Sequence, residues 1–335
     1  MKQKLLKPPS KNGEILILPS LKEILSLLKE DSLLGVAHQP YFFNPGISLK
    51  FIFLQNLPVG KKKIIFVDTD RVKIEVKLPS QEEKINFLDT DEVLFNYSTP
   101  SENQLKDFFL KIENRLKRPS LPEEVILNFL NFKEIFFENL NKRFLKEVLA
   151  ESFLRFYRIS QEWCFLTDLF DKTFNDFFFK IYRESDYFRD VFNTALDEYK
   201  KNFRFRFKNF PFPKLEKEEL PFWILKENKR VRFFKKDWNK KEEIKKLKVF
   251  PRAVALTIFL RLYKLNFFIH GVGGANYEWI ANRIIERFFK KEVPHYAVVS
   301  GTFLLSDLKE RQFPYFFFNP LKIKEKLRIF KEKNF

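Results

Sequence analysis

The chain has 335 residues, of which 45% are hydrophobic and 32% charged, and its net charge at pH 7 is +18. This composition excludes a disordered chain and allows one large domain or two ordinary ones. The single cysteine, Cys164, excludes an internal disulfide and a cysteine-based zinc site, and no apolar stretch approaches the roughly 20 residues of a membrane helix.

The positive charge bears on partners and location. It attracts nucleic acid, phosphorylated small molecules and acidic membranes. The lysines are spread along the whole chain, however, which favours a solvated basic surface. The start of the chain lacks a continuous apolar core, because Pro8 and Pro9 interrupt it, so we expect no secretory signal. We predict a cytoplasmic protein without a membrane partner, and the sequence leaves its oligomeric state open.

Residues 1–100 are expected to form the first half of an α/β core. Residues 33–37 are typical of a strand, residues 38–46 of a turn-like loop, residues 47–57 of a helix and residues 63–67 of a second strand. This order predicts a βαβ unit with two parallel strands. Residues 71–78 alternate apolar and polar side chains and predict a further strand, at an edge.

Residues 101–202 are expected to form a large helical insertion, because apolar residues recur at helical spacing and no glycine occurs between Gly60 and Gly271. Residues 203–335 then predict the second half of the core. They contain a helix at 253–264, a strand at 265–269, a glycine loop at 270–276, a helix at 277–289 and a strand at 296–299. The expected fold is α/β and Rossmann-like, with a mostly parallel sheet split by the insertion.

The glycine loop is the first candidate site. Gly271, Gly273 and Gly274 would let the backbone approach a ligand, and the start of the next helix favours an anion such as the phosphate of a nucleotide. The dinucleotide fingerprint fails, because Asn276 occupies its third glycine position and the next strand does not end in an acidic residue. The alternative is a tight strand-to-helix turn without a ligand.

The loop after the first strand is the second candidate site. Gln39 lies just beyond the strand, Gly46 starts the helix, and Lys50 is one turn further on, where it could neutralise a phosphate or carboxylate. Asp68 and Asp70 end the neighbouring strand and could hold a hydroxyl-rich ligand, an ammonium group or Mg²⁺, although a pair of turn caps is an equal alternative.

Three residues are candidates for acid–base catalysis. His38 and His270 follow the two predicted strands and titrate near neutral pH, and Glu278 lies one helical turn beyond the glycines. Arg252 is a candidate anion clamp. A single histidine is more often a structural residue, so that interpretation stays open.

The segment FRFRFKNFPFP, residues 203–213, suggests a different function. Its alternating aromatic and basic residues, among them Arg204 and Arg206, could stack on single-stranded nucleic acid. The alternative, which we favour for Phe203, Phe205 and Phe207, is a strand with phenylalanines on one face and basic residues in water.

Two runs also resemble a known family. The first is HQPYFFNPGISLK followed by a strand ending in VDTD; the second is PRAVALTIFLRL with IHGVGGANYEWI and VPHYAVVSGTF. In order and spacing they resemble the BshC family of cysteine-adding enzymes of bacillithiol synthesis, over about the first eighty and the last ninety residues. The chain is similar as well to an uncharacterised bacterial group with HQP…PG…K and HGxGGAxY loops, and the HQP start occurs in WbqC-like proteins too.

The resemblance implies a Rossmann-like core and a ligase-like activity that joins an amino acid to an amine, with a nucleotide as a candidate cofactor. The matching positions are Gln39, Pro40, Gly46, Lys50, Asp70, Arg252, Gly273, Gly274 and Glu278. The chain departs from the family at His38 and His270, is shorter, and lacks the carboxy-terminal coiled coil, which puts the bacillithiol substrate in doubt.

The sequence thus predicts a BshC-like enzyme that binds an anionic small molecule or nucleotide and forms a carbon–nitrogen bond. Two alternatives stay open. One is a non-catalytic nucleic-acid-binding protein that uses its basic surface, and the other is a scaffold that kept a ligase-like fold and lost the chemistry.

Overall fold

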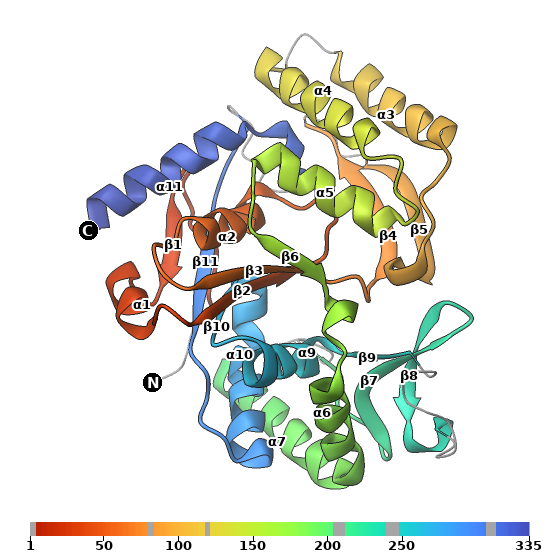
Figure 1. Ribbon diagram of the computed structural model, residues 1–335, viewed down its shortest axis with the longest axis vertical. Coiled ribbons are helices and arrows are strands. Elements are labelled where there is room, and N and C mark those ends of the chain that lie inside the picture. The colour runs from red at the N-terminus through yellow and green to blue at the C-terminus, as the bar shows by residue number, and fades with distance from the viewer. Residues whose placement is uncertain are drawn as a thin grey trace.

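A six-stranded sheet lies at the centre of the computed structural model, which describes residues 5–79, 84–117, 121–203, 212–238, 248–305 and 313–334 (Figure 1). The strand order is β1-β11-β10-β2-β3-β6. The strands are β1 (Ile15–Leu18), β2 (Leu33–His38), β3 (Lys61–Phe66), β6 (Glu162–Phe165), β10 (Phe267–His270) and β11 (Tyr296–Gly301). Only β1 is antiparallel to its neighbour, so the chain is a mixed α/β protein with a mostly parallel central sheet.

The two predicted strand–helix–strand units lie side by side in this sheet. Helix α2 (Pro45–Gln55) connects β2 with β3. Helix α10 (Val272–Ile284), which continues as a π-helix at Ile285–Phe289, connects β10 with β11. The units join where β10 pairs in parallel with β2, with Ile269 opposite Val36. Because the strands are parallel, the carboxyl ends of β2 and β10 meet at one edge, where open α/β sheets bind ligands.

Helices cover both faces of the central sheet, so the buried parts of its strands are apolar on both sides. In β3, Ile64 and Phe66 pack into one cluster and Ile65 into the other. The first cluster includes α2 with α1 (Leu21–Leu27), α5 (Leu145–Tyr157) and α11 (Pro320–Asn334). The second includes α10 with α6 (Lys172–Arg183), α7 (Ser185–Phe203) and α9 (Ala253–Phe259).

The stretch predicted as a helical insertion also supplies a strand to the central sheet. Its helices are α3 (Glu102–Leu116), α4 (Glu123–Glu138), α5, α6 and α7. Between α5 and α6, the short strand β6 pairs in parallel with β3, with Cys164 opposite Ile65. A strand of four residues has too little alternation to stand out between two helical patterns.

A second, antiparallel sheet has the order β4-β5-β8-β7-β9. Its strands are β4 (Arg71–Lys77), β5 (Lys84–Val93), β7 (Glu219–Lys226), β8 (Lys229–Phe234) and β9 (Val249–Pro251). The strand predicted at residues 71–78 is its edge strand β4, and β7 and β8 form an antiparallel hairpin. Figure 1 shows this sheet beside the carboxyl ends of the parallel strands.

No helix of the described segments is both long enough and apolar enough to cross a membrane.

Candidate functional site

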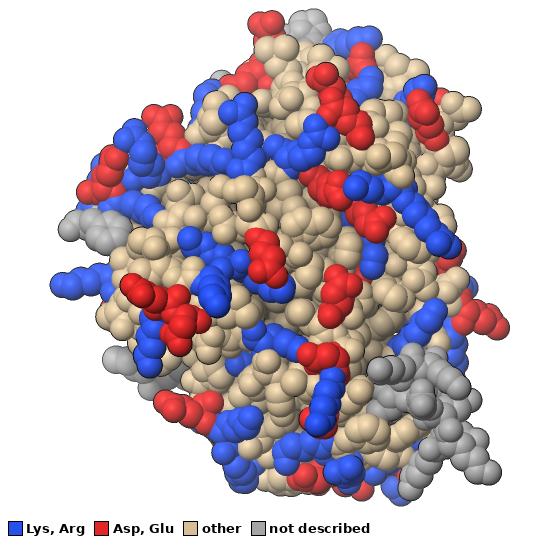
Figure 2. Space-filling model, viewed as in Figure 1, with Lys and Arg blue, Asp and Glu red and all other residues tan. Residues whose placement is uncertain are grey.

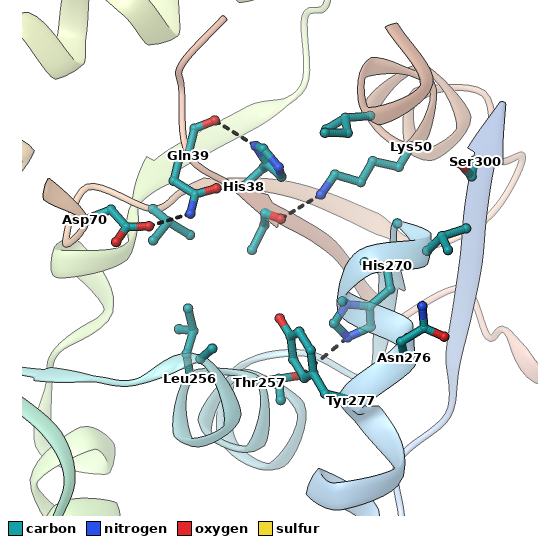
Figure 3. Close-up of a pocket in the computed structure, with 18 of the residues that line it drawn as sticks. His38, Gln39, Lys50, Asp70, Leu256, Thr257, His270, Asn276, Tyr277 and Ser300 are labelled. Atoms are coloured by element: carbon teal, nitrogen blue, oxygen red, sulfur yellow. Dashed lines mark hydrogen bonds between the residues drawn. The ribbon is translucent and has the colours of Figure 1, made fainter. Parts of the chain in front are cut away.

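A cavity of about 1060 Å³ lies between the two sheets, at the carboxyl ends of β2, β10 and β11 (Figure 3). It is lined by many of the residues proposed from the sequence, namely His38, Gln39, Gly46, Lys50, Asp70, Arg252, His270, Gly271, Gly273 and Gly274. The first and last parts of the chain thus contribute to one cavity. Asp68 and Glu278 are not among the residues that line it.

Helix α2 starts against the end of β11, and this contact requires Gly46. A Cβ atom on Gly46 would lie 2.2 Å from the carbonyl oxygen of Gly301. Asn44 caps the helix, since its side chain accepts a hydrogen bond from the Ile47 N–H. The amino-terminal end of α2, with its positive dipole, therefore lies at the cavity wall.

Lys50 projects from α2 into the cavity and is only 4% exposed (Figure 3). Its Nζ donates a hydrogen bond to the carbonyl oxygen of Ala37 at 2.9 Å. No carboxylate of the described segments forms an ion pair with it. Burial lowers the pKa of Lys50 to about 7. The cavity thus contains a buried cationic group without a compensating anion, which is energetically costly unless a ligand supplies one.

His38 and Gln39 also line the cavity, and they lie to the left of the Lys50 side chain in Figure 3. Burial, and then the charge of Lys50, lowers the pKa of His38 to about 3, so this histidine is neutral at physiological pH. The Gln39 side chain donates a hydrogen bond from Nε2 to Asp70, and Asp70 also forms an ion pair with Arg230 of β8. Asp70 therefore lines the cavity with its negative charge balanced by Arg230.

The predicted glycine loop is largely helical, which corrects the sequence-based boundary. Helix α10 begins at Val272, so Gly273 and Gly274 belong to its first turn. Glycine is a poor helix former and indicated a loop, but the first helical turn tolerates it where space is short. Gly271 is the N-cap and has no side chain to cap the first N–H groups of α10. These first residues of α10 line the cavity.

The side chain of Glu278 lies behind His270 rather than in the cavity. Glu278 is fully buried, and its Oε1 lies 2.6 Å from the Nε2 of His270. It also accepts hydrogen bonds from Thr257 and from the buried Arg261. Although burial acts in the opposite direction, His270 and Arg261 bring the pKa of Glu278 to about 2. Glu278 is therefore a positioning residue for His270.

His270 is held in one orientation by this network. Burial lowers its pKa, although the Glu278 carboxylate raises it. Because Arg261 already balances the charge of Glu278, we assign a neutral imidazole whose Nε2–H donates to Glu278 and whose Nδ1 carries no proton. An unprotonated Nδ1 could accept a proton from a substrate.

Substituting Gln for Glu278 is expected to reverse the tautomer of His270. Arg261 would bind the amide oxygen of the new side chain, which leaves its NH₂ group facing His270 Nε2. Nε2 would then become an acceptor and Nδ1 would gain the proton. The ¹⁵N chemical shifts of the imidazole nitrogens report this change, and the chain has only three histidines to assign. An unchanged tautomer in E278Q, with the His38 signals as internal reference, would contradict the assigned network.

Alanine at Gly273 and at Gly274 should have opposite effects on stability. At Gly274 a Cβ would lie 2.5 Å from His270 Nδ1, whereas at Gly273 nothing lies within 4 Å. We expect G274A to lose about 1–3 kcal/mol of unfolding free energy through overpacking. G273A should gain up to about 1 kcal/mol, because alanine favours the helix. Urea denaturation measures both, and equal losses would show that the two glycines are not distinguished by His270.

The structure places Asp68 away from the cavity, which corrects its assignment as a ligand-binding residue. Asp68 is fully buried and forms an ion pair with Lys146 of α5, with Nζ and Oδ2 2.7 Å apart. It also accepts hydrogen bonds from the Thr167 backbone N–H and hydroxyl. Asp70, two residues further on, lines the cavity, whereas Asp68 does not. Within the described segments, no cluster of three or more His, Cys, Asp or Glu residues could hold a metal ion.

Arg252 lines the cavity from the start of α9 and is paired with a carboxylate. Its guanidinium donates to Glu219 at 2.6 Å and lies 4.4 Å from the centre of the Trp223 ring. Arg230 lies over the same ring at 5.2 Å. This wall comes from the second sheet and from α9.

Several residues of the candidate site were not predicted from the sequence. Arg230 and Trp223 line the cavity from the second sheet, which was not predicted as a separate element. Tyr277 also lines it, and Figure 3 shows its hydroxyl directed into the cavity. The sequence gives only a weak indication that Arg261 is buried, because this charged residue lies on an otherwise apolar helix before the predicted strand. The only hint for Tyr277 is its place next to Glu278, directly after the glycines.

The proposed nucleic-acid-binding strip lies mostly outside the described residues, since residues 204–211 are not described. On the face shown in Figure 2, Lys and Arg side chains are interspersed with Asp and Glu. That face therefore has no continuous basic tract for a nucleic-acid backbone to follow.

Comparisons with known proteins were made for the whole chain. No protein-family model matches it, and no curated protein matches it in sequence.

Proposed function

We propose that this chain is an enzyme that binds an anionic small molecule, with a phosphate or carboxylate group, in the cavity between the two sheets. The observation that carries the proposal is the buried Lys50 amine, which has no carboxylate partner in the described segments and lines the same cavity as the first residues of α2 and α10. Both helix starts and the amine favour negative charge in this cavity. A ligand anion would remove the cost of burying the Lys50 charge.

The reaction that we propose is carbon–nitrogen bond formation between an amino acid and an amine, as the resemblance to the BshC family implies. An amine attacks only after it has lost a proton, so such an enzyme needs a base close to its anionic substrate. His270 lines the same cavity as Lys50 and is the candidate base, whereas His38 is a much weaker base because its pKa is lowered to about 3. A nucleotide is the first candidate for a third substrate, beside the amino acid and the amine.

Ligand-induced thermal shifts test the binding step. Wild type should show a higher Tm with millimolar phosphate, citrate or ATP, because a ligand stabilises the state that binds it. K50M should lose this shift, whereas K22M, at an exposed position of α1, should keep it. A shift that K50M retains would place the anion elsewhere.

The bond-forming step needs a separate measurement. Mass spectrometry of mixtures of ATP, amino acids and amino sugars should show a condensed product that forms with wild type. H270A should form it much more slowly while keeping its phosphate-induced thermal shift. Equal rates for H270A and wild type would remove His270 from the reaction.

A further inference from the structure

The Lys50 amine has surroundings unlike those of an ordinary surface lysine. Its side chain is 4% exposed, and its Nζ donates a hydrogen bond to the carbonyl oxygen of Ala37 and lies 5.4 Å from the centre of the Phe51 ring. In Figure 3 the end of the side chain lies between His38 and His270, in the open part of the cavity. Burial lowers the pKa values of both histidines most, and the positive charge of Lys50 lowers them further. The amine is thus accessible from the cavity but shielded from bulk water.

We propose that Lys50 is a nucleophile that forms an imine with an aldehyde or ketone bearing a phosphate or carboxylate group. This activity rests on the anion-binding cavity of the proposed function. A lysine desolvated in a pocket and close to other positive groups is a typical imine-forming residue. The anion of the substrate would face the starts of α2 and α10, which places its carbonyl group beside Lys50.

The protonation state of Lys50 supports the same inference. Burial lowers its pKa to about 7, so a large fraction of the amine is unprotonated at neutral pH. Surface lysines keep pKa values near 10.4 and are almost wholly protonated there. The difference should make Lys50 the most reactive lysine of the described chain towards a carbonyl compound that enters the cavity.

The reaction is balanced without an oxidant or a reductant. The nitrogen lone pair forms a bond to the carbonyl carbon, and a proton moves from nitrogen to the carbonyl oxygen to give a carbinolamine. The remaining proton of the nitrogen is then transferred to this hydroxyl group, which leaves as water while the carbon–nitrogen double bond forms. His270, whose Nδ1 carries no proton, lines the cavity and can relay these protons. A cavity of about 1060 Å³ has room for such a substrate.

Reductive trapping tests the proposal. Wild-type protein is incubated with equimolar pyridoxal 5′-phosphate, reduced with borohydride and mapped by peptide mass spectrometry. Glyoxylate is a second, smaller probe in case the pyridine ring does not fit. We expect a single main adduct on Lys50, which inorganic phosphate suppresses at least fivefold. K50R, which keeps a positive charge but cannot form an imine, should lose the adduct, and K22M should keep it.

The outcomes separate this inference from the proposed function. Labelling spread over exposed lysines with both probes, with Lys50 unmodified, would overturn the imine proposal. If wild type still shows a phosphate-induced thermal shift in that case, the anion-binding proposal stands. If the shift is absent too, both proposals fail. Labelling of Lys50 that phosphate does not suppress would contradict the anion-directed part of the inference.

Discussion

Replacing Lys146 with methionine is expected to lower the free energy of unfolding by about 3–5 kcal/mol. Lys146 is the ion-pair partner of the fully buried Asp68, and its ammonium group lies 4.6 Å and 4.2 Å from the ring centres of Phe95 and Phe165. Burial raises the pKa of Asp68, and Lys146 acts in the opposite direction. Without Lys146, Asp68 must stay charged without its ion-pair partner or take up a proton, and both are costly.

Urea denaturation measures this loss. The matched control is K106M, which removes the exposed ion pair of Lys106 with Glu102 on α3. An exposed pair contributes little, so K106M should change the free energy of unfolding by no more than about 0.5 kcal/mol. The double variant D68N/K146M should regain part of the loss, because it removes the unpaired charge. A change below about 1 kcal/mol in K146M would show that the pair is not a major source of stability.

Replacing Lys50 with methionine is expected to stabilise the protein without ligand. The pKa of Lys50 falls to about 7 in the folded protein, from 10.5 as the ordinary value. Each pKa unit corresponds to about 1.4 kcal/mol, so the cost of the buried charge has an upper limit of about 5 kcal/mol. Methionine has a similar length and no charge, and it removes this cost together with the anion site.

The stabilisation should depend on pH in a defined direction. At pH values below about 7, Lys50 is protonated in both states and the folded state carries the full cost. Between about 7 and 10.5 the folded state binds fewer protons than the unfolded state, so wild-type stability rises and the gain from K50M shrinks. Above that range the difference in charge is gone.

Denaturation series at several pH values, with K22M as the exposed control, measure this trend. A gain that is the same at pH 6 and pH 9.5 would mean that the pKa of Lys50 is not lowered. A destabilised K50M at pH 6 would mean that the amine has a compensating partner. Saturating phosphate should reduce the gain, since it stabilises wild type alone.

A stabilising K50M variant would also support the functional assignment. Residues that destabilise a protein are commonly kept at sites where activity needs them. In the described segments, Lys50 differs in this respect from Lys146, because Lys146 has a carboxylate partner and lies outside the cavity.

The sequence determined the local units of this protein. Runs of apolar residues and the glycines and prolines between them located β2, α2, β3, β10, α10 and β11, because these patterns depend on neighbours in the chain. For the same reason they located His38 and His270 at strand ends and Lys50 on the helix that follows β2. The start of α10 was placed too late, since glycines signal a loop even in a first helical turn.

Only the tertiary structure decided which of these charged groups are paired. Asp68 and Asp70 are two residues apart, yet one is buried against Lys146 of α5 and the other meets Arg230 of the second sheet. Glu278 on α10 pairs with Arg261 on the helix that follows α9, and it also contacts His270 on the side away from the cavity. The partner of a charge depends on long-range packing, which local periodicity does not encode. Whether Lys50 had a carboxylate partner was therefore decided by the folded chain.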